Sequence, residues 1–143
     1  MAQPKLGTSK SNKPMHYAVG ALIKNGSKYL LIDRAITPYG YAGLAGHIDK
    51  NESASKALVR EVKEESGLKV TKHKLLYKEE LGGVMCSRGV NVHYWFLFEC
   101  KVTGKIKRNF AETKSIGYYT KEEISSLELE SSWKYWFQKL GVI

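Results

Sequence analysis

The helix and flanking turns between Gly46 and Leu68 constrain this chain more than any other feature. Asn51 and Ser53 can cap the start of a helix, and Gly67 can adopt the left-handed conformation that ends one. We therefore predict a helix from about 53 to 66. Its apolar stripe consists of Ala54, Ala57, Leu58 and Val62.

Two glutamates of this helix share the inward face with the apolar stripe. At about 100° per residue, Glu61 and Glu65 lie about 40° apart and within the angular range of the stripe. Inward carboxylates repel each other and lose hydration, so they need a cation. The positions four residues from Glu61 are Ala57 and Glu65, and neither carries a positive charge. A divalent cation such as Mg2+ would satisfy this arrangement.

The fixed residues of the segment resemble the Nudix box. Their spacing is G-x5-E-x7-R-E-U-x-E-E-x-G-U, where U is aliphatic, and the chain matches every fixed position. The matching residues are Gly46, Glu52, Arg60, Glu61, Val62, Glu64, Glu65, Gly67 and Leu68. The resemblance implies the α/β Nudix fold, which is an α/β/α sandwich with a mixed β-sheet.

The resemblance also implies a metal site. Glu61, Glu64 and Glu65 would bind Mg2+ or Mn2+, together with the backbone carbonyl of Ala45. The general base differs among such enzymes, and three candidates stay open here. They are Glu64 and Glu65 within the box, and Glu112 from a later loop.

Other box residues would hold the site in shape. Glu52 and Arg60 would pair to fix the loop against the helix, which makes Arg60 part of the catalytic apparatus. Gly46 and Gly67 would serve the backbone geometry. Many relatives carry Pro-Gly-Gly at the entrance to the box, whereas this chain has Ala-Gly-His. We expect His47 to be a loop histidine without a ligand role, since no other His or Cys lies at metal-binding spacing.

The activity implied by the resemblance is metal-dependent hydrolysis of a diphosphate linkage in a nucleotide-type substrate. Nucleoside triphosphates, ADP-ribose and nucleotide sugars are the leading substrate classes, with dinucleoside polyphosphates and capped RNA behind them. The alternative is a non-catalytic module of the same fold that binds a nucleotide or RNA. Such modules typically lose box carboxylates, and this chain keeps all three.

The residues outside the box predict a sheet between helices. Runs of apolar, β-branched and aromatic residues predict strands at 16–24, 28–35, 70–80, 90–102 and 115–119, with a turn at Asn25-Gly26. Thr120 and Glu123 form a capping box for a short helix. The final helix, from about 131 to 140, carries an aromatic face that we expect to cover the sheet.

Three residues ahead of the box are candidates for substrate binding. Arg34 lies at the exit of the second strand and suits a phosphate, although a solvated arginine is equally common there. Tyr39 and Tyr41 lie in the following loop, where they could stack on a base or pack in the core. Arg88, in a later glycine-rich loop, either borders the pocket or belongs to an ordinary hairpin loop.

Composition sets the remaining expectations. The 143 residues suffice for one domain, which we place at 15–143 after a flexible basic tail at 1–14. The net charge of +9 suits a polyanionic nucleotide and would also attract RNA, although no RNA-binding motif is visible. With two cysteines, and without a secretory segment or an apolar run of membrane length, we expect a cytoplasmic protein with free thiols that does not bind membranes. Homodimers are common among similar proteins, and the sequence leaves that state open.

Overall fold

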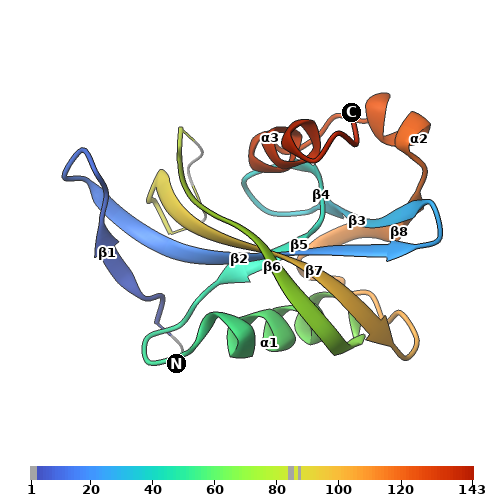
Figure 1. Cartoon of the computed structure of the whole chain (residues 1–143), viewed down its shortest axis with the longest axis horizontal. Helices are drawn as coiled ribbons and strands as arrows, with labels where there is room; N and C mark the ends of the chain where they lie inside the picture. Colours follow the sequence, from blue (N-terminus) through green and yellow to red (C-terminus); the bar gives the residue numbers. More distant parts are fainter. Residues whose placement is uncertain (1–2, 84–85, 87) are drawn as a thin grey trace.

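The computed structural model describes residues 3–83, 86 and 88–143 (Figure 1). The strands are β1 (Leu6–Thr8), β2 (Pro14–Asn25), β3 (Lys28–Arg34), β4 (Gly40–Ala42), β5 (Leu44–His47), β6 (Lys69–Gly82), β7 (Val92–Thr103) and β8 (Thr113–Tyr119). The helices are α1 (Ala54–Ser66), α2 (Lys121–Ser125) and α3 (Ser131–Lys139).

The sheet is mixed and lies between helices, as the α/β/α prediction required. Its strand order is β4-β3-β2-β7-β6, with β1 and β5 also paired to β2 and β8 paired to β3. β2 and β7 run parallel, and the other pairs are antiparallel. α1 covers one face, and α2 and α3 lie on the opposite side (Figure 1). The fold class is therefore confirmed.

The box helix begins and ends at the residues that the sequence indicates. The Ser53 hydroxyl accepts a hydrogen bond from the backbone N–H of Lys56, and Gly67 ends the helix at φ 75°. The first hairpin differs by one residue from the expected turn: Asn25 still pairs with Lys28, so Gly26 and Ser27 form the turn. Gly26 takes the first turn position with φ 62°, a conformation that glycine adopts without strain.

Part of the segment 1–14, which we expected to be a flexible tail, forms the short strand β1. β1 pairs with the start of β2, with Leu6 opposite His16. The backbone N–H of Lys5 also donates to the carbonyl of Ile48 at 2.8 Å. The polar composition of this segment hid the strand, because backbone hydrogen bonds to a sheet edge need no apolar side chains.

The aromatic face of α3 is part of the core, as expected. Trp133, Trp136 and Phe137 are buried, and the rings of Trp133 and Trp136 each meet Trp95 of β7 edge-on. This packing holds the C-terminal helix against the sheet beside the cavity described below. Among the residues that the structure describes, no helix is long and apolar enough to cross a membrane.

Candidate active site

The carboxylates of α1 lie against the strand that leads into the box. β5 pairs with β2, which places Gly46 opposite Val19. The Glu61 carboxylate packs directly on Gly46, so a Cβ atom there would overlap the carboxylate carbon and both of its oxygens. A glycine at position 46 therefore lets Glu61 reach the backbone of the loop.

Arg60 connects the helix to the loop through several charged groups. Its Nε donates to Glu52 Oε2 at 2.8 Å, and its Nη2 donates to Glu52 Oε1 and to the carbonyl of His47, both at 2.9 Å. Its Nη1 reaches Glu61 Oε1 at 2.7 Å and Glu64 Oε2 at 3.3 Å. The hydrogen bonds from Arg60 lower the pKa of Glu52, and those acceptors raise the pKa of Arg60 further above its ordinary value.

Glu65 is the most deeply buried acid of the site, at 2% exposure. Burial raises its pKa well above the usual range and nearby Glu61 adds to this, while a hydrogen bond from the Ala45 N–H, at 2.8 Å, opposes it. Burial also raises the pKa of Glu61 to about 7, despite the contact with Arg60. Two adjacent carboxylates with raised pKa values would be stabilised in their charged forms by a further cation.

A cavity of about 390 Å3 collects these groups. Glu61, Glu64 and Glu65 line it from the helix, and Glu112 lines it from the loop before β8. That loop is attached to the end of β3 by a hydrogen bond of 2.9 Å from the N–H of Ala35 to the carbonyl of Glu112. The cavity thus joins the box carboxylates to the one later acid that the sequence suggested.

The donor set fits a hard divalent cation. Within the described residues, Arg60 and the Ala45 N–H each engage only Oε1 of their glutamate, Glu61 and Glu65 respectively. Oε2 of each is left for another partner. Glu64 adds a carboxylate whose side chain is 54% exposed, and Ala45 lines the same cavity. Carboxylate and carbonyl oxygens suit Mg2+ or Mn2+.

The predicted substrate residues separate into two groups. Arg34 lines the cavity, and its Nε donates to the carbonyl of Pro38 at 2.6 Å. Arg88 also lines the cavity. The two tyrosines do not belong to this lining: Tyr39 is 64% exposed, and the ring of Tyr41 packs edge-on against Tyr119. The hypothesis that they stack on a base finds no support in this geometry.

The cavity also has a histidine-rich wall that the sequence did not suggest. His47, Cys86 and His93 line it, and His16 lies against the first two. Burial lowers the pKa of His47 to about 3 and that of His93 to about 4. No His or Cys lies at metal-binding spacing from His47 in the sequence, yet three such side chains lie beside it in the structure, because sheet pairing joins residues far apart in the chain. The only advance signal was that most of the chain's four histidines fall in strands.

Comparison with known proteins identifies the fold and the family. The NUDIX domain profile matches residues 14–140. Among solved structures, the MutT protein from Methanosarcina mazei Go1 has a TM-score of 0.74 at 20% identity, with 89% of this chain and 93% of that chain covered. A MutT NUDIX hydrolase from Burkholderia pseudomallei has a TM-score of 0.70 at 20% identity, with 85% and 94% covered. For the E. coli ORF135 protein the TM-score is 0.62 at 24% identity, with 82% and 81% covered.

No curated protein matches the chain significantly. The solved structures establish the likeness of fold, and the domain match spans most of the chain. A sheet between helices together with a complete box of this spacing defines the Nudix class of hydrolases. This chain belongs to the Nudix family.

Proposed function

We propose that the protein is a pyrophosphohydrolase that uses Mg2+ or Mn2+ to cleave a diphosphate linkage in a nucleotide-type substrate. The observation that carries this proposal is the burial of Glu65 beside Glu61 on the wall of a cavity. Keeping two ionised carboxylates together at 2% and 15% exposure is unfavourable unless a cation joins them.

Each polar group of the cavity has a proposed role. Glu61, Glu64 and Glu65 would hold the metal with the carbonyl of Ala45. A divalent cation in such a site supplies positive charge to phosphate oxygens and acidifies bound water. Arg60 holds Glu61 through a 2.7 Å hydrogen bond, so it acts by positioning a ligand.

Phosphate recognition would come from arginines on the cavity wall. Arg34 is fixed by its bond to the Pro38 carbonyl, and Arg88 lies in the loop before β7. Fixed guanidinium groups orient a diphosphate by paired hydrogen bonds. The bond that breaks is a P–O bond of the anhydride, and the attacking water contributes its oxygen to the phosphate that it attacks.

The proton of the attacking water requires an acceptor. Glu112 lines the cavity from a separate loop, and Glu64 is half-exposed, so both can approach solvent. Glu65 is enclosed and accepts from Ala45, which suits a ligand better than a base. We therefore propose Glu112 or Glu64 as the base, with Glu65 as a ligand.

The test is phosphate release with and without Mg2+ across nucleoside triphosphates, ADP-ribose, nucleotide sugars, dinucleoside polyphosphates and capped RNA. Auxiliary pyrophosphatase and phosphatase convert the products to phosphate. We expect metal-dependent turnover of one substrate class. Glu65→Gln should lack this turnover, and the control variant His73→Ala, which changes an exposed histidine outside the cavity, should keep it. No turnover of any class, with nucleotide binding intact, would contradict hydrolysis and favour the non-catalytic binding module.

A further inference from the structure

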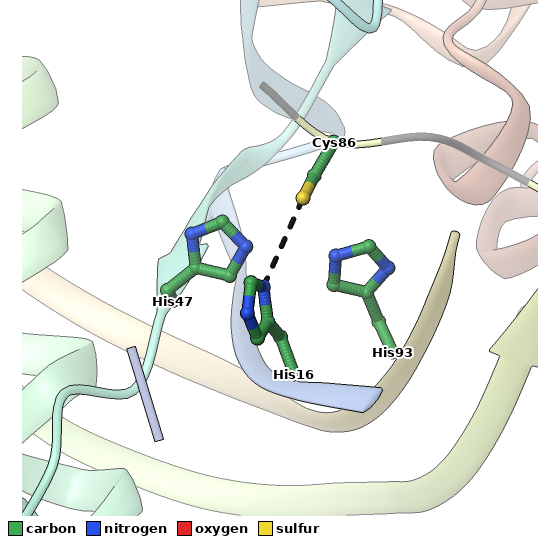
Figure 2. Close-up of side chains that lie close together, drawn as sticks. All are labelled: His16, His47, Cys86 and His93. Carbon is green, nitrogen blue, oxygen red and sulfur yellow. Dashed lines mark hydrogen bonds between the residues drawn. The ribbon is translucent and has the colours of Figure 1, made fainter. Parts of the chain in front are cut away.

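Four side chains that can bind a metal meet at the histidine-rich wall of the cavity. They are His16, His47, Cys86 and His93, and their ligand atoms all lie within 4.8 Å of one another. Figure 2 shows the three imidazoles and the thiol grouped around a common space. The cluster takes three of the chain's four histidines and one of its two cysteines.

Strand register creates the cluster. The parallel pairing of β2 with β7 places His16 beside His93, and the antiparallel pairing of β2 with β5 places His47 opposite Ala18. Ala18 is two residues from His16, and side chains two apart on a strand share one face of the sheet. The three histidines thus project from neighbouring strands on one face, and Cys86 joins them from the segment between β6 and β7.

The contacts within the cluster are close. The rings of His16 and His47 meet edge-on with centroids 4.9 Å apart, and those of His47 and His93 stack at 5.5 Å. Cys86 Sγ lies 3.8 Å from His16 Nδ1. His16, Cys86 and His93 are at least nine-tenths buried.

One ligand atom in the cluster lacks an ordinary partner. Within the part of the chain that the structure describes, Nε2 of His93 is buried and has no hydrogen-bond partner. A buried polar nitrogen without a hydrogen-bond partner destabilises the folded state. A purely structural packing of three imidazoles and a thiol leaves that nitrogen unexplained, whereas a metal bound to imidazole nitrogen explains it.

We propose that His16, His47, Cys86 and His93 form a Zn2+ site. Three imidazole nitrogens and one thiolate make up the four-ligand set of a closed zinc site. Tetrahedral zinc, with Zn–N about 2.0–2.1 Å and Zn–S about 2.3 Å, places ligand atoms about 3.3–3.6 Å apart. On binding, the ligand atoms that are farthest apart would have to move about 1 Å closer together. The thiol of Cys86 releases its proton to solvent on binding.

This site differs from the carboxylate site in chemistry and in role. Nitrogen and sulfur ligands select zinc, whereas the glutamate oxygens suit Mg2+ or Mn2+. Four protein ligands leave no position for substrate, so the zinc would be structural. It would attach Cys86 to β5, where the backbone carbonyl of His47 also accepts a hydrogen bond from Arg60 at 2.9 Å. The inference does not depend on the proposed hydrolase activity.

The experiment measures zinc in the purified full chain. An untagged protein is used, because a histidine tag binds zinc, and a phosphine reductant keeps the thiols reduced. The protein is stripped with a chelator, titrated with ZnSO4, desalted and analysed by elemental mass spectrometry. His93→Ala and Cys86→Ser remove ligands. His73→Ala and Cys100→Ala are the matched controls, since neither residue belongs to the cluster.

We expect one zinc per chain in wild type and both controls. Both ligand variants should lose most of their zinc on desalting, because each lacks one of the four ligands. Co2+ added to stripped wild type should give a thiolate charge-transfer absorption that Cys86→Ser lacks. The wild-type spectrum tests the thiolate ligand even if a variant fails to fold. Equal zinc content in wild type and His93→Ala, or cobalt without the thiolate band, would overturn the proposal.

Parallel assays separate this proposal from that of the hydrolase. Glu65→Gln should keep one zinc per chain while its Mg2+-dependent phosphate release is lost. A wild type that hydrolyses nucleotides but binds no zinc would refute only the zinc site. A wild type that binds one zinc through Cys86 but hydrolyses nothing would leave the zinc site standing and remove the proposed activity.

Discussion

The cavity has two walls of buried titratable groups, and they differ in how the chain builds them. The acidic wall comes from one turn of a single helix, Glu61 to Glu65, with Glu112 added from a loop. The histidine wall is built from residues far apart in the sequence, between His16 and His93. A single helix fixes its side chains by local spacing, whereas the histidine wall depends on which strands pair and in which register.

The two walls respond to burial in opposite directions. Burial raises the pKa of Glu61 to about 7 and lowers the pKa of His47 to about 3. Both shifts favour the neutral form. Neutral imidazole is already the form that binds metal, whereas a neutral carboxyl must lose a proton first. Metal binding should therefore compete with protons at Glu61 and Glu65, but not at the histidines.

The largest expected effect is on catalysis at the acidic wall. Glu65→Gln keeps the shape of the side chain and removes the charge that a divalent cation would need, so phosphate release should fall by orders of magnitude. Steady-state kinetics at saturating Mg2+ measures this, with circular dichroism to establish that the fold is kept. Turnover near that of wild type would rule out Glu65 as a metal ligand.

The second effect is on stability as a function of pH in metal-free protein. The pKa of Glu61 is about 7 in the folded state and 4.5 when unperturbed, so the folded state binds more protons between these values. Its contribution to stability is complete below pH 4.5 and is lost as pH rises towards 7, by at most about 3 kcal/mol. The contributions of His47 and His93 to stability change with pH in the opposite direction. Below pH 6.5 these histidines are protonated in the unfolded state but not in the folded state, so stability falls as pH falls.

Comparing Glu61→Gln with wild type isolates the carboxylate, since the histidines are common to both. Urea unfolding from pH 5 to 8 in a chelator should show the variant gaining stability relative to wild type as pH rises. Mg2+ should reduce that difference by stabilising the ionised wild type. A difference that does not change with pH would contradict the raised pKa of Glu61.

The third effect tests the contact between the loop and the helix. A Cβ atom at position 46 overlaps the Glu61 carboxylate, so Gly46→Ala must displace that side chain. We expect a loss of about 1–3 kcal/mol in unfolding free energy together with weakened Mg2+ activation. Gly82→Ala is the control, because nothing lies within 4 Å of a Cβ there. Urea unfolding measures the loss. Equal unfolding midpoints for the two variants would show that the loop adapts to the added methyl group without strain.

The two walls also show how far the sequence could predict this molecule. Ser53 and Gly67 marked the ends of the box helix, and helical spacing turned Glu61 and Glu65 inward, so the acidic wall followed from local rules. Local rules could not predict the histidine wall or β1, because both form only when other strands pair with β2. Local rules also left the role of Tyr39 open, since the direction of a loop side chain depends on neighbours distant in sequence.

The smallest expected effect is the coupling between the walls. Glu61, the Ala45 N–H and Arg34 have the leading effects on the Glu65 pKa after burial, and His16 has that role for His93. Glu65 is not among the groups that shift the pKa of His93, and His93 is not among those that shift the pKa of Glu65. A double-mutant cycle of Glu65→Gln and His93→Gln, measured by urea unfolding without metals, should give a coupling energy below about 0.5 kcal/mol. A coupling above about 1 kcal/mol would mean that the two walls form one electrostatic unit, and that metal at either would change affinity at the other.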